Sequence, residues 1–296
     1  MKYFSTFTGI GGLDIGLQEI GAECVGFSEI KDTSIKIYAS HYPDHKNYGD
    51  ITKIDYKKLP DFDLLIGGFP CQAFSMAGAR QGFKDKKGVM IFYLYDLILA
   101  KKPKFIVLEN VKGLLTHDKG NTYLNVIRLL SSAGYYVRVL LLNALNYGSA
   151  QNRERLIFLC SREDFPKKNP EIIDNTKTFR DFVDKDESHY IYVEETEKNL
   201  AKINKTDLFP FDLIGGYDRV GTLMTSVSGS GRSQTIIQDG DRFRFLTAVE
   251  GERLQGFPDG WTEMVSNTAR WFAIGNAVNC NVSRYLFTNY LKGLWY

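Results

Sequence analysis

Residues 3–20 read YFSTFTGIGGLDIGLQEI: an apolar stretch of strand length, a turn with three glycines, and then a pattern of helical period. Glycine permits a tight turn and lets a ligand approach the backbone closely. A helix that starts after such a turn offers free N–H groups to the anionic end of a ligand. A glycine-rich turn can also serve packing alone, so residues 3–20 predict a strand–turn–helix unit and only suggest a binding site.

Strand-like apolar stretches alternate with helical patterns up to about residue 165. This alternation predicts a doubly wound, mainly parallel α/β sheet with helices on both faces, which binds ligands at the carboxyl ends of its strands. We expect strands at Tyr3–Phe7, Cys24–Ser28, Leu64–Gly67, Phe105–Glu109, Tyr136–Leu142 and Leu156–Cys160. We expect helices at Leu13–Ile20, Thr33–His41, Ile91–Lys101 and Tyr123–Ala133.

Length and composition indicate an ordinary globular protein. The 296 residues, 44% hydrophobic and 24% charged, suffice for one large domain with an insertion or for two domains. A formal charge of +2 leaves any nucleic-acid binding to a local basic patch. The first residues lead straight into a strand, and no apolar run approaches ~20 residues. We therefore expect no signal peptide, no membrane segment and a cytoplasmic protein.

The cysteines and histidines indicate no metal site. The four cysteines are far apart and form no CxxC pair: Cys24, Cys71, Cys160 and Cys280. This argues against a disulfide framework and a structural zinc site, and it suits a reducing cytosol. His41 and His45 have the spacing of a helical metal pair, but Pro43 between them would break the helix. We expect two surface histidines near a turn.

The second half of the chain has a different pattern. Residues 181–197 carry seven acidic side chains against one lysine, which is typical of a solvated helix and loop. Short β-like pieces and glycine-rich turns follow and indicate a smaller inserted domain. Regularity returns at Arg244: residues 247–250 have the Thr-x-x-Glu form of a capping box that opens a helix. An apolar face from Val278 to Tyr290 indicates a closing helix.

Acidic residues after the next strands indicate a cofactor. Glu29 lies twenty residues beyond Gly9 and just past the second strand, where an acid can bind ribose hydroxyls. Asp50 follows another expected strand and could hold an adenine amine. Asp14 stands where a dinucleotide-binding turn has its third glycine. Together these residues predict an adenosine-containing cofactor without a pyrophosphate.

Cys71 follows a strand end in the sequence Gly67-Gly68-Phe69-Pro70-Cys71. A free cysteine is usually a small core residue. Here the position is that of a ligand crevice, Pro70 stiffens the turn, and the two glycines permit close approach to the backbone. A free thiol has a pKa of about 8.5, so a nucleophilic Cys71 would need a partner that activates the electrophile.

Glu109 and two arginines are candidate partners of Cys71. Glu109 follows the buried-type strand at residues 105–108 and could hydrogen-bond a ring nitrogen, although it could also be a structural carboxylate. Residues 151–155, Gln-Asn-Arg-Glu-Arg, place Arg153 and Arg155 two residues apart. The two arginines could lie on an exposed edge, or their guanidinium groups could bind a ring carbonyl, a carboxylate or a phosphate.

Residues 78–88 form a basic, glycine-rich segment just after Cys71. They contain four cations, one anion and three glycines, and the cations are Arg80, Lys84, Lys86 and Lys87. Such a segment is usually a solvated loop. Next to a catalytic cysteine it also suits closure over a polyanion.

The motifs, taken together and in order, resemble the DNA (cytosine-5)-methyltransferase family over nearly the whole chain. Eight segments carry the resemblance: Phe7–Gly12, Glu29, Asp50, Pro70–Gln72, Glu109–Val111, Gln151–Arg155, Arg253–Pro258 and Gly275–Val278. One motif could arise by chance, but eight in order are hard to explain otherwise.

The resemblance implies S-adenosylmethionine as the methyl donor and a covalent mechanism. Cys71 would attack C6 of a target cytosine, Glu109 would stabilise the N3-protonated ring, and the target base would leave the duplex. Arg153 and Arg155 would hold the base. The cofactor-binding residues would be Phe7, Gly9, Gly11, Gly12, Glu29, Ile30, Asp50, Ile51, Gly68, Pro70, Asn276 and Val278.

The resemblance also implies a domain plan. Residues 1–185 would form the catalytic S-adenosylmethionine-binding domain with a Rossmann-like methyltransferase sheet. Residues 186–270 would hold a smaller, mostly β target recognition domain and hinge, and residues 271–296 would return to the catalytic domain. Thr222 resembles part of a Thr-Leu pair of such recognition domains, so we expect it to contact DNA with the cations of residues 78–88.

Function is therefore expected to be methylation of a specific duplex DNA sequence by a monomer, plausibly beside a cognate restriction endonuclease. Two alternatives stay open: methylation of tRNA cytosine, known for a branch of the same family, and a DNA-binding regulator without activity. A dinucleotide-dependent oxidoreductase is weaker, because Asp14 breaks the glycine pattern and nothing in that reaction requires Cys71 with Glu109.

Overall fold

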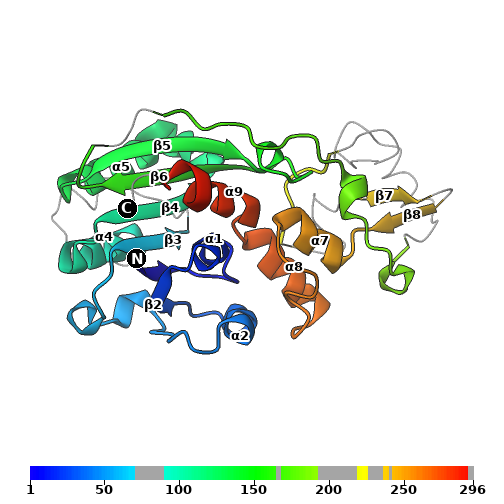
Figure 1. The fold of residues 1–296 in the computed structure, drawn as a ribbon, viewed down its shortest axis with the longest axis horizontal. Coiled ribbons are helices and arrows are strands. Elements are labelled where there is room, and N and C mark those ends of the chain that lie inside the picture. The colour runs from blue at the N-terminus through cyan, green and yellow to red at the C-terminus, as the bar shows by residue number, and fades with distance from the viewer. Residues whose placement is uncertain (71–89, 165–167, 193–218, 226–235, 240–241, 293–296) are drawn as a thin grey trace.

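The computed structural model describes residues 1–70, 90–164, 168–192, 219–225, 236–239 and 242–292. Figure 1 shows an elongated molecule with a central sheet at one end and a small antiparallel strand pair, β7 (Ile236–Asp239) and β8 (Arg242–Phe245), at the other. Helices α7 (Ala248–Gln255) and α8 (Asn267–Asn276) lie between the sheet and this pair.

The central sheet has six strands in the order β2-β1-β3-β4-β6-β5. Their bounds are β1 Lys2–Thr6, β2 Glu23–Ser28, β3 Leu64–Gly68, β4 Phe105–Val111, β5 Tyr136–Asn143 and β6 Glu154–Ser161. β1 pairs in parallel with β2 and β3, and β3 with β4, whereas β6 is antiparallel to β4 and β5. Because β1 lies between β2 and β3, the strand order reverses there, and open α/β sheets bind ligands in the crevice at such a point.

The predicted α/β sheet is confirmed, and all six predicted strands form, with ends that differ by no more than two residues. β6 is the one reversed strand because a connection of only ten residues, 144–153, joins it to β5, and neighbours joined this way pair antiparallel. The strand expected before Asp50 is wrong. Only Asn47 pairs there, in a single bridge to Phe27, and Gly49 at φ 73° then turns the chain away.

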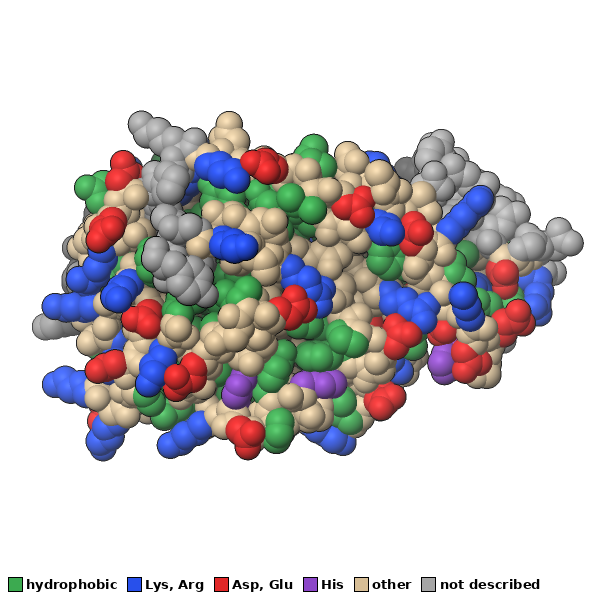
Figure 2. All heavy atoms as spheres, in the orientation of Figure 1, with side chains coloured by type: hydrophobic (Ala, Val, Ile, Leu, Met, Phe, Trp, Pro, Cys, Tyr) green, Lys and Arg blue, Asp and Glu red, His purple; other side chains and the backbone are tan. Residues whose placement is uncertain are grey.

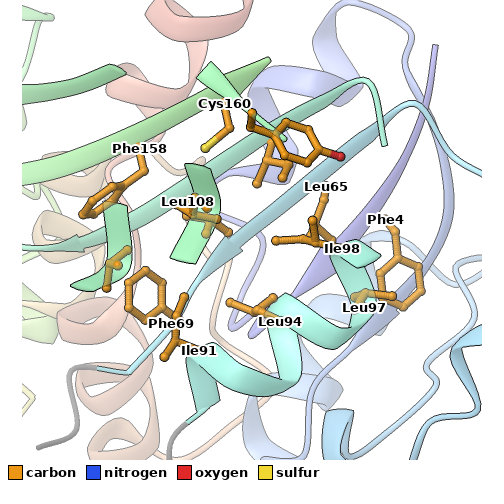
Figure 3. Packing of buried hydrophobic residues seen from close by; sticks show 14 of the residues in the cluster. Phe4, Leu65, Phe69, Ile91, Leu94, Leu97, Ile98, Leu108, Phe158 and Cys160 are labelled. Atoms are coloured by element: carbon orange, nitrogen blue, oxygen red, sulfur yellow. The ribbon is translucent and has the colours of Figure 1, made fainter. Parts of the chain in front are cut away.

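Helices cover both faces of the sheet. On one face, α4 (Met90–Lys101) and α5 (Asn121–Ser132) pack against the sheet, and Figure 3 shows Leu94, Leu97 and Ile98 of α4 against sheet residues such as Leu65. The free thiol of Cys160 lies buried in the same cluster. Cys160 is therefore a small packed core residue, which is the ordinary role of a free cysteine.

The other face is covered by the first and last helical segments of the chain. These are α1 (Asp14–Glu19), α9 (Cys280–Arg284) and the π-helical turn η8 (Tyr285–Tyr290). Leu17 of α1 and Leu286 of η8 are fully buried in one cluster with Ile66 of β3. The predicted closing helix is thus confirmed as α9 followed by η8, and it packs beside α1 on this face of the sheet.

The remaining described elements are short, apart from α2 (Asp32–His41). Single 3₁₀ turns occur at Ile51–Lys53, Tyr56–Lys58, Lys112–Leu115, His117–Gly120, Ala144–Asn146, Phe179–Phe182 and Glu187–His189. The sequence predicted that His41 and His45 are surface residues, but both are half-buried: His41 is the last residue of α2, and His45 follows it. His41 stacks on Trp261 with ring centroids 3.5 Å apart, and His45 Nδ1 lies 3.0 Å from the Tyr38 hydroxyl.

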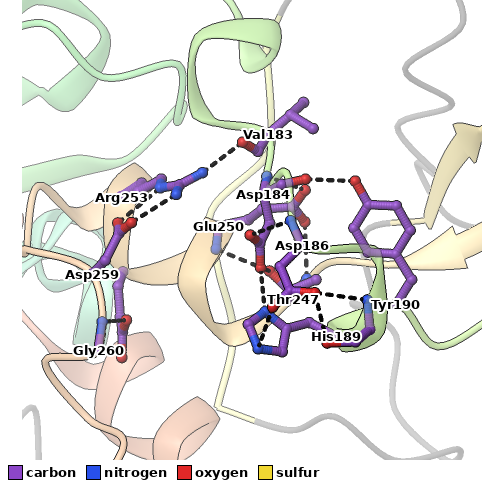
Figure 4. A network of polar contacts seen from close by, with 12 residues as sticks. Val183, Asp184, Asp186, His189, Tyr190, Thr247, Glu250, Arg253, Asp259 and Gly260 are labelled. Atoms are coloured by element: carbon purple, nitrogen blue, oxygen red, sulfur yellow. Dashed lines mark hydrogen bonds and ion pairs between the residues drawn. The ribbon is translucent and has the colours of Figure 1, made fainter.

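A buried polar network fixes the start of α7, as Figure 4 shows. The predicted capping box is confirmed: Thr247 Oγ1 accepts from the Glu250 amide at 3.1 Å, and the Glu250 carboxylate accepts from the Thr247 amide at 2.9 Å. Glu250 also accepts two bonds from Arg244, at 2.8 and 3.0 Å. The backbone of Asp184 donates to Glu250, and its carboxylate lies 2.7 Å from His189 Nδ1. Asp184 is 4% exposed, so this member of the acidic run is not solvated, contrary to the expectation from sequence, and anchors α7, whereas Asp181, Asp186 and Glu187 are exposed.

Candidate active site

A cleft opens at the carboxyl ends of β1, β3 and β4, beside the point where the strand order reverses. The empty space in it is about 390 Å³ when its open mouth is included. The lining residues come from five segments: Ser5–Gly9, Gly12–Asp14, Gly67–Gly68, Glu109 and Asn276–Val278. The structure therefore brings together the glycine turn, the end of β3, Glu109 and the C-terminal motif, as the sequence predicted.

The glycine turn is shaped by close packing on one side and open space on the other. A Cβ on Gly12 would lie 2.3 Å from the Val278 carbonyl oxygen, so only glycine lets the turn reach the C-terminal segment. Gly9 has φ 58° and no heavy atom within 4 Å of an added Cβ, so its open side faces free space. Gly11 has φ 89°, and an added Cβ would touch the ring of Tyr38. The turn thus has the shape of a cradle that a ligand can approach.

Glu29 is tied to the same turn. One carboxylate oxygen accepts from the Gly9 amide at 2.8 Å, and the other accepts from the amides of Ile30 and Lys31 at 2.8 and 2.9 Å. Ile30 itself is 69% exposed, which is unusual for a large apolar side chain. These contacts join the end of β2 to the glycine turn and leave an apolar side chain uncovered next to it.

Asp50 and Ile51 do not line the cleft. Asp50 Oδ1 accepts from the Thr52 amide and hydroxyl at 2.9 and 2.8 Å and so caps a 3₁₀ turn. Ile51 is buried in the core with α4. Among the predicted cofactor residues, Phe7, Gly9, Gly12, Gly68, Asn276 and Val278 do line the cleft.

Glu109 and Arg155 form the buried ion pair of the site. In the register of β4 and β6, Glu109 pairs with Ile157 and Val111 pairs with Arg155, so the two charged side chains are diagonal neighbours on one face. Arg155 Nε lies 2.9 Å from Glu109 Oε1, and both side chains are less than 15% exposed, at 14% and 11%. A Cβ on Gly68 would lie 3.2 Å from Glu109 Oε2, so the carboxylate lies over the end of β3.

Burial controls the protonation of this pair. Burial raises the pKa of Glu109, and the neighbouring Arg155 and Arg153 oppose the shift. Burial lowers the pKa of Arg155, with Glu109 opposing. A carboxyl group whose pKa is raised by burial keeps its proton closer to neutral pH than an exposed one. Glu109 is therefore suited to donate a hydrogen bond to a ring nitrogen.

Arg153 does not face the cleft, contrary to the expectation that it holds a base. It is 2% exposed, and its terminal nitrogens donate to the carbonyl oxygens of Leu223 (3.3 Å), Gly275 (2.9 Å) and Ala277 (2.8 Å). Burial, together with repulsion from Arg155, lowers its pKa to about 9. Arg153 thus fixes two backbone segments, one of which continues into the wall of the cleft at Asn276–Val278.

Gln151 completes this attachment. Its side chain accepts from the Leu223 amide at 3.1 Å and donates to Gln255 at 3.2 Å, and Thr222 Oγ1 donates to the Asn152 carbonyl at 2.7 Å. The contacts hold residues 222–223 against the segment that leads into β6. Thr222, expected to contact DNA, keeps an exposed side chain there.

Asn110 is a residue whose role the sequence did not reveal. Its side chain donates to the Phe69 carbonyl at 2.9 Å and so fixes the end of β3 two residues before Cys71. Its position inside the Glu109–Val111 motif was the available signal. Asp14 is a second such residue: it lines the cleft and is 1% exposed.

Several predicted residues lie outside the described part of the chain. They are Cys71 and the cations Arg80, Lys84, Lys86 and Lys87. Pro70, the last described residue before this gap, is exposed.

The described residues hold neither a metal cluster nor a membrane span. In the ranges that the structure covers, no group of three or more His, Cys, Asp or Glu side chains could bind a metal ion. No helix in those ranges is both long and apolar enough to cross a bilayer. Figure 2 shows acidic and basic side chains interspersed over the face it presents, as expected for a formal charge of +2.

Comparison with known proteins identifies the family. The profile of C-5 cytosine-specific DNA methylases matches residues 1–292. The chain belongs to this family. C-5 cytosine methyltransferases of this family use S-adenosylmethionine, so membership of the family confirms the expected cofactor.

Individual relatives agree with this family. The type II methyltransferase M.DsaV of Dactylococcopsis salina is 35% identical over 298 residues, with 96% of this chain and 84% of the relative covered. The orphan methyltransferase M.Rho11sI of Bacillus phage rho11s is 38% identical over 253 residues, and here the match spans 73% of this chain but only 50% of the relative. The chain thus spans about half the length of the phage relative.

The fold of this C-5 methylase family member also matches a solved structure. The crystal structure of S. pombe Dnmt2 methyltransferase aligns with a TM-score of 0.80 at 20% identity, over 100% of both chains. At this identity the similarity establishes the fold alone.

The cleft fits the methyl donor of the family. The open side of Gly9 gives room at the turn, and Ile30 offers an uncovered apolar surface next to Glu29. The ionisable side chains among the described lining residues are both acids, Asp14 and Glu109, so no cation of this described lining repels a donor with a positive sulfonium.

Proposed function

We propose that this protein transfers a methyl group from S-adenosylmethionine to C5 of a cytosine in a specific duplex DNA sequence. The observation that carries the proposal is the buried Glu109–Arg155 pair at the end of β4, which lies over the end of β3 and opens on the cleft. Methylation at C5 requires an acid that can hydrogen-bond the pyrimidine ring, a cysteine that can attack it, and a cofactor cleft next to both.

The proposed mechanism begins with Cys71. Its thiolate adds to C6 of the cytosine while Glu109, whose pKa burial raises, gives a proton to N3 and so neutralises the negative charge that develops on the ring. Arg155 orients Glu109 and binds the carbonyl oxygen at C2. Asn110 holds the Phe69 carbonyl, and thereby the backbone before Cys71, in position. C5 then takes the methyl group, and loss of the C5 proton and of Cys71 restores the aromatic ring.

S-Adenosylmethionine supplies an electrophilic methyl group when bound. We expect Phe7, Gly9, Gly12, Gly68, Asn276 and Val278 to bind it in the cleft, with Glu29 and Ile30 at the adenosine end. Gly11, Asp50, Ile51 and Pro70 would act indirectly, by shaping the turns around the site.

DNA recognition is proposed for the second half of the chain. A target base inside a duplex cannot reach Cys71, so it must be flipped out. Residues 186–270 would form the target recognition domain and hinge, and residues 271–296 would return to the catalytic domain. The exposed Thr222, fixed by Gln151 and Arg153 through its neighbour Leu223, and the cations of residues 78–88 would contact DNA.

The test is methyl transfer on DNA. Purified protein is incubated with labelled S-adenosylmethionine and genomic duplex DNA, and modified positions are mapped by bisulfite sequencing. We expect 5-methylcytosine within one short sequence and none with Cys71→Ser. Label on another atom, or equal activity of Cys71→Ser, would contradict the proposal.

A competition assay distinguishes duplex DNA from tRNA as the substrate. The similarity to S. pombe Dnmt2 methyltransferase concerns fold alone and does not favour tRNA. With equal amounts of tRNA and duplex DNA, we expect label on the DNA. The term type II in the name of M.DsaV supports a role beside a restriction endonuclease, and action as a monomer in the cytoplasm stays a prediction.

A further inference from the structure

Two acids line the cleft, and they are held in different ways. Glu109 has a cationic partner, Arg155, at 2.9 Å. Asp14, the first residue of α1, is 1% exposed, and among the described residues its carboxylate has hydroxyl groups and its own backbone amide, not a cation, as hydrogen-bond donors. Ser5 Oγ donates to Asp14 Oδ2 at 3.1 Å, and the Tyr38 hydroxyl donates to Oδ1 at 2.9 Å.

This arrangement leaves the charge of Asp14 poorly compensated. Hydroxyl groups stabilise a carboxylate less than a guanidinium does. Burial accordingly raises the pKa of Asp14 to about 6, although the bonds from Tyr38 and Ser5 oppose the shift. A buried carboxylate that lacks a cation gains the most from a cationic ligand placed in the space beside it.

The ligands of this cleft differ by one charge. S-Adenosylmethionine has a positive sulfonium, whereas the product, S-adenosylhomocysteine, has a neutral thioether of nearly the same shape. A packed wall cannot distinguish them well by size, because they differ by one methyl group. A nearby negative charge can distinguish them, because it attracts only the sulfonium.

We propose that Asp14 is a specificity-determining residue that makes the cleft bind the sulfonium donor more tightly than its neutral thioether product. The inference rests on the proposed function only in that the cleft must hold the methyl donor. Asp14 would act through space, from beneath the glycine turn, and would take no part in the chemistry on the cytosine. The device would favour release of product after each methyl transfer.

Other titratable groups face Asp14, and their protonation must be distinguished from that of Asp14. The pKa values of Tyr3 of β1, Tyr38 of α2 and Tyr42 are raised by burial, and that of Cys24 of β2 is raised to about 12, so these groups stay neutral near pH 6. His45 contacts the Tyr38 hydroxyl at 3.0 Å, and burial lowers its pKa. Glu109 shares the cleft.

The experiment measures the dissociation constants of S-adenosylmethionine and S-adenosylhomocysteine by calorimetry, for the full chain and two variants. Asp14→Asn removes the charge and keeps the shape. Tyr38→Phe is the matched control at pH 8: loss of its hydrogen bond raises the Asp14 pKa, but the carboxylate keeps its charge at this pH. We expect Asp14→Asn to lower the preference for the sulfonium ligand by about tenfold, as expected for one unit charge at close range. Tyr38→Phe should retain most of it.

A pH series on the unmodified protein, with Asp14→Asn as its control, is a second test of the inference. The preference for S-adenosylmethionine should fall as the pH drops from about 7 to about 5, through the Asp14 pKa of about 6, because protonation removes the charge. In Asp14→Asn the ratio should be flat over this range. A pH dependence that persists in this variant would assign it to Glu109 or His45 and overturn the inference.

The outcomes distinguish the inference from the proposed function. If both ligands bind and Asp14→Asn weakens them equally, the charge-selecting role of Asp14 is overturned and the methyltransferase proposal stands. If the unmodified protein binds neither ligand, the proposed function fails and the inference fails with it. If Asp14→Asn does not fold, the pH series is repeated on Glu109→Gln, which removes the other acid of the described lining. A pH dependence that persists there supports the role of Asp14, and its disappearance overturns it.

Discussion

Glu109 shows how one side chain acquires its chemistry from its surroundings. Its carboxyl group is buried at the end of β4, and the same burial that raises its pKa brings it within 2.9 Å of Arg155. The two effects oppose each other, so the protonation of Glu109 depends on the presence of Arg155.

Glu109→Gln should leave the cofactor bound but slow methyl transfer. The amide keeps the size of the side chain but cannot give a proton to N3. We expect kcat to fall by about 10²–10⁴-fold, the range for loss of a general acid. The dissociation constant of S-adenosylmethionine, measured alongside, should change less than about threefold. A variant with unchanged kcat would remove Glu109 from the mechanism.

Arg155→Met should move the pH profile of kcat to higher pH. Arg155 lowers the pKa of Glu109, so its removal lets burial raise that pKa further. If protonated Glu109 is the active form, activity persists to higher pH, although its maximum is lower because the C2 carbonyl loses a partner. Arg155→Lys keeps a positive charge and should shift the alkaline limb less. If the ionised form were the active one, the acidic limb of the profile would instead move to higher pH, because Glu109 would lose its proton only at higher pH.

At the level of elements, the cleft depends on backbone segments that approach without side chains between them. The turn after β1 meets the segment after α8 at Gly12, where an added Cβ would lie 2.3 Å from the Val278 carbonyl. This contact joins the first and last motifs of the chain across one wall of the cofactor site.

Gly12→Ala should therefore abolish cofactor binding. The methyl group would meet backbone rather than a flexible side chain, so the two segments must separate. Calorimetry with S-adenosylmethionine should detect no binding at micromolar ligand. Gly21→Ala is the control: it has φ 72° and open space around the added Cβ, so it should cost about 1 kcal/mol of stability and leave binding intact. Normal binding by Gly12→Ala would mean that the turn does not form the cradle described.

The elements were more predictable from sequence than their contacts. Strand ends followed from local apolar runs, and the motif residues at those ends converge because parallel strands share one edge. The position of Arg153 was not predictable, because its three acceptors lie 70, 122 and 124 residues away. The strand expected before Asp50 failed for a local reason, since Gly49 turns the chain after one bridge.

At the scale of the whole molecule, Arg153 joins the central sheet to the second half of the chain. It reaches Leu223, Gly275 and Ala277 from the start of β6, and Gln151 and Gln255 extend the buried polar contacts between the same segments. The family resemblance predicted that Arg153 and Arg155 hold the target base. It did not reveal that Arg153 is structural.

Arg153→Met should destabilise the protein and weaken cofactor binding together. Three buried carbonyl oxygens would lose their donor, which we expect to lower the free energy of unfolding by about 2–4 kcal/mol. Urea denaturation measures this change. Arg180→Met, at an exposed position, should change it by less than about 0.5 kcal/mol. Loss of methyl transfer with full stability would instead place Arg153 at the substrate.

The central claim is that Cys71 bonds to C6 of a cytosine in duplex DNA, and trapping that bond tests it most directly. Duplex DNA with 5-fluorocytosine at the mapped target position blocks the last step, because fluorine at C5 cannot leave as a proton. Mass spectrometry of the digested complex should find the methylated base attached to the peptide that contains Cys71, only when S-adenosylmethionine is present. Methylation of the ordinary target without any trapped adduct, or an adduct on another residue, would contradict the claim.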